Sequence, residues 1–186
     1  MANAGEVPSS GPCADAPPPS AWVQRFAPLI PAVGEVLDLA CGSGRHLRLL
    51  LARGQPMVGV DRDLSQLQDL AGTPALELIA ADLEEGRSWP LGERRFAGVV
   101  VTNYLHRPLL PAIVRAVAPG GMLIYETFAL GNERFGRPRN PDFLLRPGEL
   151  LDAVTGQLEV LAYENLEVDK PRPAAVQRIA ARRPTP

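Results

Sequence analysis

The chain has 186 residues, which is enough for one domain with its own hydrophobic core. Its hydrophobic content of 46%, charged content of 22% and net charge of -2 are typical of a soluble globular protein and exclude a strongly basic nucleic-acid-binding face. No apolar run reaches the length of a membrane span, and no signal-peptide pattern opens the chain. Because two cysteines make no disulfide framework, we expect a cytoplasmic protein that does not associate with membranes.

The first segment is rich in Pro, Ala, Ser and Gly. Residues 1–19 end in three prolines and carry too little apolar surface to offset the entropy of ordering. We therefore expect a disordered tail at 1–19 and a single domain at 20–186. Ser20 is suited to cap a helix over 21–29, whose apolar face carries Trp22, Val23, Phe26 and Leu29. This face belongs either to the core or to the roof of a ligand pocket.

After this helix, apolar strands alternate with helical stretches. Strands are predicted at 35–39, 57–61, 76–81, 97–102 and 122–127, and helices at 44–53, 64–70 and 108–117. Pro119-Gly120-Gly121 is predicted to end the last helix. Short, continuous, β-branched runs of this kind are typical of a parallel sheet buried on both faces. Two alternating runs, 158–168 and 175–181, predict a C-terminal antiparallel hairpin.

A glycine turn follows the first predicted strand, in Asp38-Leu-Ala-Cys-Gly-Ser-Gly44. The next strand ends on Asp61, which is placed to accept hydrogen bonds from the hydroxyls of a ribose. This layout predicts a nucleoside-cofactor site. A dinucleotide site would need a third glycine where Leu47 stands, and Asp38 favours a ligand with positive charge over a pyrophosphate.

The Asp38–Gly44 motif resembles the first motif of class I S-adenosylmethionine (SAM) methyltransferases, with His46 in place of that family's usual third glycine. The resemblance covers 20–183 and implies a three-layer α/β, Rossmann-like sandwich. Its sheet would be mostly parallel and seven-stranded, ending in the antiparallel hairpin. SAM would be the cofactor and S-adenosylhomocysteine the product. No metal is implied.

The resemblance also assigns cofactor-binding residues. Those around the amino-acid part of SAM would be Asp38, Ala40, Cys41, Gly42 and Gly44. Asp61 would hold the ribose, with Arg62 near the adenine edge. Those around the adenine would be Ala81, Asp82 and Leu83, and those near the methionine portion Asn103 and Tyr104. Two alternatives stay open: Cys41 is either a reactive thiol or a small residue that fits the turn, and Asp82 either binds cofactor or caps a helix.

Two residues are candidates for a general base. His106 has an ordinary pKa near neutrality, although a loop histidine often only caps a helix, and Glu126 at the end of the fifth strand is the second candidate. A soft nucleophile would need neither. Thr102-Asn-Tyr-Leu-His-Arg-Pro108 is not the Asn/Asp-Pro-Pro-Tyr/Phe segment that grips planar nitrogens in amino-methylating relatives.

The long segment 129–143 follows the fifth strand and is predicted to be an ordered, substrate-binding lid. Phe128, Phe135 and Phe143 would form an apolar wall. The segment carries three arginines, and a fourth follows it: Arg134, Arg137, Arg139 and Arg146. This positive charge indicates either an anionic acceptor or a solvated surface. The stretch at 143–150 loosely resembles small stand-alone methyltransferases of the tellurite-resistance type.

The sequence therefore predicts a SAM-dependent methyltransferase that acts on a small-molecule acceptor, with nucleic acid not expected as a partner. The alternatives are an RNA or protein methyltransferase and a SAM-binding protein without catalysis. The oligomeric state is left open.

Overall fold

A computed structural model describes residues 17–84 and 89–185, so the part of the expected tail at 1–16 lies outside the described residues. Seven strands form one sheet in the order β3-β2-β1-β4-β5-β7-β6. The strands are β1 (Val36–Leu39), β2 (Met57–Asp61), β3 (Leu76–Ala80), β4 (Phe96–Thr102), β5 (Val117–Phe128), β6 (Glu159–Val168) and β7 (Ala174–Arg182). The first five pair in parallel, and β7 pairs antiparallel to both β5 and β6.

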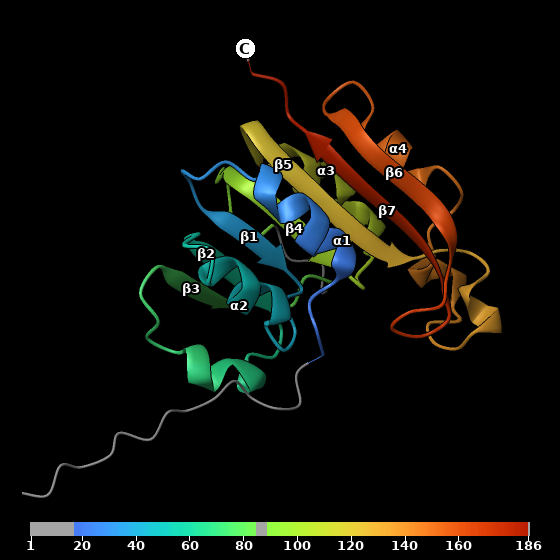
Figure 1. Cartoon of the computed structure of the whole chain (residues 1–186), viewed down its shortest axis with the longest axis horizontal. Helices are drawn as coiled ribbons and strands as arrows, with labels where there is room; N and C mark the ends of the chain where they lie inside the picture. Colours follow the sequence, from blue (N-terminus) through green and yellow to red (C-terminus); the bar gives the residue numbers. More distant parts are fainter. Residues whose placement is uncertain (1–16, 85–88, 186) are drawn as a thin grey trace, which may run out of the picture.

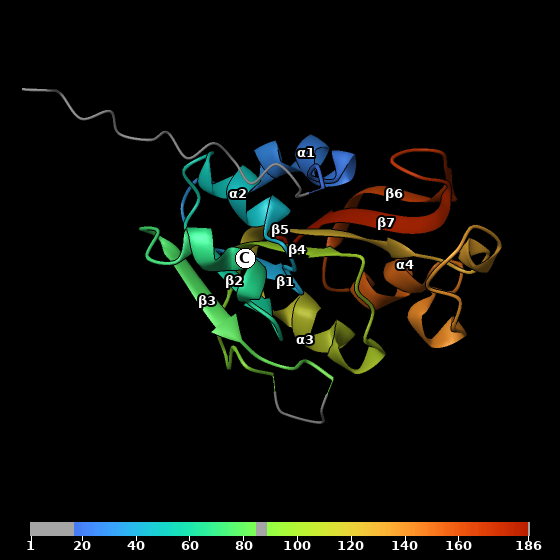
Figure 2. The same ribbon diagram turned by 90° about the horizontal axis from the view of Figure 1, so that it is seen from below.

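Helices cover both faces of this sheet and make three layers (Figures 1 and 2). One face carries α1 (Ala21–Phe26) and α2 (Arg45–Leu51), and the other carries α3 (Leu110–Arg115) and α4 (Glu149–Val154). The central strands β1 and β4 are buried along their whole length, whereas β3 and β6 at the two edges are partly exposed. The continuous apolar runs of the sequence are thus the interior of a doubly covered sheet, and the predicted fold class is confirmed.

The alternation of side chains divides the core into two clusters. Leu123, Tyr125 and Ile179 pack on the α3 and α4 side, and Met122, Ile124 and Ala180 pack with α1. Even-numbered positions of β5 and β7 therefore face α1.

The helix predicted at 64–70 is present as a 3₁₀ helix, Ser65–Leu70. Two local expectations were wrong. Leu29 is exposed, and Ile30 takes its place in the core. Pro119-Gly120-Gly121 lies inside β5, where the register against β4 shifts, instead of ending a helix. A side chain at 121 would meet the carbonyl oxygens of Ala118 and Phe96 at 2.9 Å, so this irregularity requires glycine.

Helix α1 follows its predicted cap closely. Ser20 Oγ accepts hydrogen bonds from the backbone N–H groups of Trp22 and Val23. Trp22 is buried and donates its ring N–H to the carbonyl of Ile179. Of the two interpretations of Trp22 and Phe26, the structure therefore favours the one in which both belong to the hydrophobic core rather than to the roof of a ligand pocket. Across 17–84 and 89–185, no helix has both the length and the hydropathy needed to span a membrane.

Candidate active site

The carboxyl ends of β1, β2, β3 and β4 meet at one edge of the sheet, where a cavity of about 370 Å³ lies. We call it the first cavity. It is lined by seven of the predicted cofactor residues, by Phe143 of the predicted apolar wall and by one residue that was not predicted, Glu84: the seven are Ala40, Asp61, Arg62, Ala81, Asp82, Leu83 and Tyr104. Residues from four separate strand ends are thus brought to one place, as expected for the edge at which open α/β sheets bind ligands.

The turn after β1 has the backbone that its glycines predict. Gly42 and Gly44 have positive φ angles of 52° and 73°, and Ala40 also has a positive φ of 55°. A side chain at 44 would approach Leu67 Cδ2 to 2.5 Å, so glycine is needed there for conformation and for space. The N–H of Gly42 donates to Asp61 Oδ2 at 2.8 Å. This hydrogen bond ties the turn to the end of β2.

Asp38 lies buried at the base of this turn. Burial raises the pKa of its carboxyl to about 7, the neighbouring Arg45 opposes this, and Asp61 adds to it. Its Oδ2 atom is buried without a hydrogen-bond partner. A buried carboxylate oxygen in this state is stabilised by any cationic or hydrogen-donating group placed beside it.

The segment after β4 places Asn103 and Tyr104 at the same edge. Asn103 has a φ of 54°, and its N–H donates to the carbonyl of Glu126. The Tyr104 side chain lines the first cavity, and its hydroxyl is buried without a partner. Burial raises the pKa of this phenol, so it stays protonated and has a hydrogen to donate.

The geometry bears on whether Cys41 is a reactive thiol and on whether Asp82 caps a helix or binds cofactor. Cys41 is buried, and burial together with Asp38 raises the pKa of its thiol, which argues against a reactive thiolate. Asp82 Oδ1 accepts from the N–H of Glu84, and the residue lines the first cavity, where its contact with a cofactor stays a prediction.

A second and larger cavity, of about 720 Å³, lies on the α1 side of the sheet. It is lined by Pro17–Ala21, by Arg45 and Asn103, by alternate residues of β5 and β7, and by the turn that joins β6 to β7. Asn103 belongs to this second cavity and its neighbour Tyr104 to the first. The two cavities therefore adjoin the same short segment after β4.

The two candidate bases differ in position. Glu126 lines the second cavity, but its carboxylate already accepts from Ser20 Oγ at 2.7 Å and from Arg178 Nη1 at 3.1 Å. His106 is half-buried just before a 3₁₀ turn at Arg107–Leu109 and belongs to the lining of neither cavity. The structure thus brings Glu126, but not His106, to the site.

His46 is a site residue whose role the sequence did not reveal. Its Nε2 accepts from the N–H of Ser20 at 3.1 Å, so its proton lies on Nδ1, 3.5 Å from Thr102 Oγ1. Burial, helped by Arg45, lowers the pKa of His46 to about 3 and keeps the ring neutral. Arg45 also donates to the carbonyl of Pro18. Arg45 and His46 thereby fasten residues 18–20 over the second cavity.

The 129–143 segment is ordered by polar contacts that span long sequence distances. The guanidinium of Arg107 donates to the Glu149 carboxylate and to the carbonyls of Asp142 and Leu144. Buried Asn132 donates to the carbonyl of Pro138 and accepts from the N–H of Ala175. Nothing in the local sequence distinguishes Arg107 from a surface arginine, so this anchor was missed.

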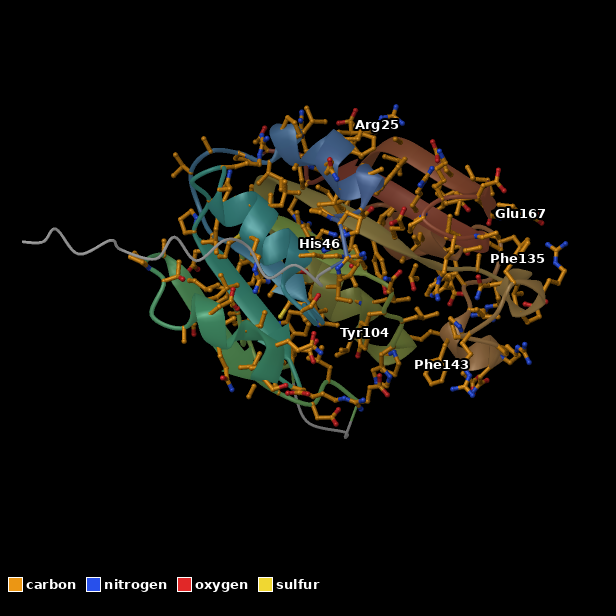
Figure 3. All side chains as sticks on the ribbon, turned by 60° about the horizontal axis from the view of Figure 1, so that its bottom comes forward. Arg25, His46, Tyr104, Phe135, Phe143 and Glu167 are labelled. Atoms are coloured by element: carbon orange, nitrogen blue, oxygen red, sulfur yellow. The ribbon has the colours of Figure 1, made fainter. Side chains whose placement is uncertain are left out.

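The three predicted phenylalanines do not form one wall. Phe128 lines the second cavity and Phe143 the first, whereas Phe135 is exposed at the outer edge of the molecule near Glu167 (Figure 3).

The arginines of this segment, and Arg146 just after it, line neither cavity. Arg134 pairs with Glu167, and Arg146 pairs with Glu149 at 3.5 Å. Arg137 and Arg139 are exposed and line neither cavity. Within the described parts of the chain, no group of three His, Cys, Asp or Glu side chains is placed to hold a metal ion.

Comparison with known proteins agrees with this geometry. Residues 36–121 match the family model described as "Methyltransferase domain". The fold is similar to TehB from Haemophilus influenzae, with a TM-score of 0.66 and 19% identity over 87% of this chain and 61% of that one. It is also similar to a SAM-dependent methyltransferase from Mesorhizobium loti, with a TM-score of 0.67 and 18% identity over 88% and 98% of the two chains.

Curated relatives match over shorter shares of their length. A trans-aconitate 2-methyltransferase from Paracidovorax citrulli is 31% identical over 50% of this chain and 38% of its own. A tRNA U34 carboxymethyltransferase from Idiomarina loihiensis is 27% identical over 78% of this chain and 50% of its own. The chain thus spans half or less of the length of these relatives.

The strand order, the glycine turn and the matched segment define a Rossmann-like protein of the methyltransferase type. Residues 36–121, a little under half of the chain, match the methyltransferase-domain model, and over most of its length the chain has the fold of SAM-dependent methyltransferases.

Proposed function

We propose that this protein binds SAM in the first cavity and transfers its methyl group to a small molecule in the second. The observation that carries the proposal is the first cavity itself, which gathers seven of the twelve predicted cofactor residues from four strand ends. Its volume of about 370 Å³ falls within the range of small-ligand pockets.

The unpartnered polar atoms near this cavity fit the cofactor. Asp38 Oδ2 lacks a partner, and the ammonium of SAM, directly or through a water, would supply one. Tyr104 likewise has a buried hydroxyl with a hydrogen to donate. Asp61 would hold the ribose hydroxyls. Arg62 and the residues 81–83 would surround the adenine.

SAM supplies a methyl carbon on a sulfonium: the acceptor's lone pair forms a bond to that carbon while the carbon–sulfur electron pair returns to sulfur. The protein's part is to align the two reactants and to keep water out. Asn103, which lines the second cavity beside Tyr104, would lie where the two ligands meet.

The surroundings of Glu126 bear on the kind of nucleophile. Ser20 donates to one of its carboxylate oxygens and Arg178 to the other, so both oxygens are already engaged and neither is placed to remove a proton from an acceptor. His106 lines neither cavity. An acceptor that is already electron-rich, such as a thiolate, a carboxylate or another anion, would react without proton removal. We therefore favour such a nucleophile over a neutral alcohol.

A small acceptor is supported by the size of the second cavity and by the relatives named trans-aconitate 2-methyltransferase. The relative named tRNA U34 carboxymethyltransferase matches a longer stretch of the chain and makes RNA the second candidate. The net charge of -2 argues against RNA, because protein surfaces that bind nucleic acid are strongly basic.

A cytoplasmic location is part of the proposal and is supported by the low number of cysteines.

The test is the formation of S-adenosylhomocysteine from SAM in the presence of candidate acceptors. A panel of small carboxylates and thiols should include at least one that raises turnover above the rate without acceptor, and unmodified tRNA should not. Turnover with tRNA alone would move the function to the RNA alternative. Binding of SAM without turnover on any acceptor would favour the non-catalytic alternative.

A further inference from the structure

The floor of the second cavity extends the face of the sheet that α1 covers. Even-numbered residues of β5 and β7 face α1, as Met122, Ile124 and Ala180 show. The same alternation puts Glu126 and Phe128 of β5 and Val176 of β7 on this face, beyond the start of the helix, where they line the cavity. Much of the floor is therefore apolar.

The end of the cavity near Asn103 is polar: Arg45 donates to the carbonyl of Pro18 there, and Arg178 and Glu126 form an ion pair. Arg178 lies opposite Glu126 in the strand pairing and donates to it, and it also pairs with Glu164. One arginine is thus shared by two carboxylates. No surplus positive charge is left on Arg178 for a ligand.

The opposite end of the cavity carries positive charge without such compensation. Lys170 and Arg172, in the turn between β6 and β7, line the cavity. Within 17–84 and 89–185, neither has a carboxylate at ion-pair distance. Asp169 precedes them but does not line the cavity. The Arg172 guanidinium lies 5.7 Å from the centre of the Phe128 ring.

The strand register separates the two ends. Phe128 pairs with Val176, and Glu126 with Arg178. Because a strand advances about 3.3 Å per residue, Ala174 at the turn lies about 13 Å from Arg178 along β7. Arg172 lies over Phe128, which is two residues, or about 7 Å, from Glu126 along β5. The distance along the strands from the two cations to the Glu126 end is therefore about 7 to 13 Å.

We infer that the methyl acceptor is an anion with an apolar body, whose charged group is bound by Lys170 and Arg172 while its reacting atom lies at the Asn103 end. The apolar body would lie on Phe128 and Val176. This inference rests on the proposed function for the identity of the reacting end. The inference assigns recognition of the acceptor's charge to Lys170 and Arg172 of the β6–β7 turn. The sequence had instead pointed to Arg137 and Arg139 of the 129–143 segment.

The test compares acids with their neutral amides. Binding of trans-cinnamate, octanoate and phenyl phosphate, and of cinnamamide and octanamide, is measured by calorimetry on the full chain at low ionic strength, with S-adenosylhomocysteine present. We expect at least one acid to bind roughly tenfold or more tighter than its amide, because an exposed amide cannot replace a charged partner. A phosphate that binds while both carboxylates do not would identify the anion as a phosphate.

The variant Lys170→Gln/Arg172→Gln should bring the acid to within about threefold of the amide without changing affinity for S-adenosylhomocysteine. The matched control, Arg137→Gln/Arg139→Gln, removes the same charge from the 129–143 segment and should retain the preference for the acid.

Three results would overturn the inference: no preference for any of the three anions over the neutral amides in the unaltered protein up to about 10 mM ligand, a preference that survives the Lys170/Arg172 change, or one that the control abolishes. Failure of S-adenosylhomocysteine to bind would instead refute the proposed function. The acid and amide titrations, repeated without it, would still decide whether the turn binds anions.

Discussion

Asp61 Oδ2 accepts the N–H of Gly42 at 2.8 Å, so the acid that ends β2 is bonded directly to the glycine turn that follows β1. Its other oxygen accepts from the N–H of Asp63 at 3.1 Å. One carboxylate therefore holds the backbone of the glycine turn after β1 and that of the segment after β2. Its loss would affect the shape of the site as well as its contacts with a ligand.

This double role gives a graded prediction for Asp61. Asp61→Ala should weaken SAM binding by about one to a few kcal/mol, because the ribose hydroxyls and Gly42 all lose their acceptor. Asp61→Asn retains an acceptor oxygen for Gly42 and should lose less. Asp63→Asn, a matched change at an exposed position that does not line the cavity, should leave the affinity unaltered. Calorimetry decides, and an unaltered affinity in Asp61→Ala would mean that Asp61 does not hold the ribose.

Asp38 predicts a pH dependence of cofactor binding. Burial raises its pKa to about 7 in the free protein. A cationic ammonium beside it would favour the ionised form, so binding should release a proton. Affinity should therefore be full above the free-state pKa and fall as pH drops below it, by roughly five- to tenfold between about pH 7.5 and about pH 6.

The control for this prediction is Asp38→Asn, which should bind more weakly and with a flatter pH profile. Calorimetry in two buffers of different ionisation enthalpy measures the proton release directly. A flat profile in the unaltered protein would show that Asp38 does not meet the ammonium.

His46 predicts a pH dependence of stability with a defined sign. Its pKa is lowered from 6.5 to about 3 in the folded protein, so it favours folding above pH 6.5, and this contribution is lost as pH falls toward 3. Asp38 titrates over an overlapping range with the opposite sign, so the unaltered protein must be compared with His46→Gln. The difference in unfolding free energy should shrink by about 2 kcal/mol between about pH 6.5 and pH 5.

Urea unfolding of both proteins across this range provides the measurement. A difference that stays constant with pH would mean that His46 is not held neutral by its surroundings.

The contacts of residues 17–20 lead us to propose that the domain begins near Pro17, three residues before the expected boundary. The carbonyls of Pro18 and Pro19 accept from Arg45 and Gln24, and all three prolines line the second cavity. Removing 1–16 should leave the melting temperature and SAM affinity unaltered, whereas removing 1–19 should cost about 1 kcal/mol of stability. Equal stability of the two shortened chains would contradict this boundary.

Much of the fold follows from the sequence because the strands carry their own signal. The runs around Val36, Met57 and Val99 are mostly apolar, as is typical of parallel strands that are covered on both faces of a sheet. The C-terminal hairpin was predicted from its alternation of apolar and polar residues. The first cavity was predictable for the same reason, since its residues directly follow these strands.

The second cavity was not predictable, because long-range contacts create it. Ser20 meets Glu126 across 106 positions, and Arg45 meets Pro18 across 27. The excess of arginine at 129–143 was visible in the sequence, but the sequence does not show that Arg134 is paired with Glu167 or that Arg137 and Arg139 are exposed away from the cavities. Likewise, a Pro-Gly-Gly run signals a break in regular structure without telling a helix end from a shift in strand register.

The central claim is that the first cavity binds SAM, and titration of the purified chain with S-adenosylhomocysteine tests it most directly. We expect a dissociation constant in the micromolar range. Ligand at about 100 times that constant should add about 2.7 kcal/mol to the unfolding free energy, with a matching rise in melting temperature. A folded sample that shows neither heat of binding nor a shift in melting temperature at about millimolar ligand would contradict it.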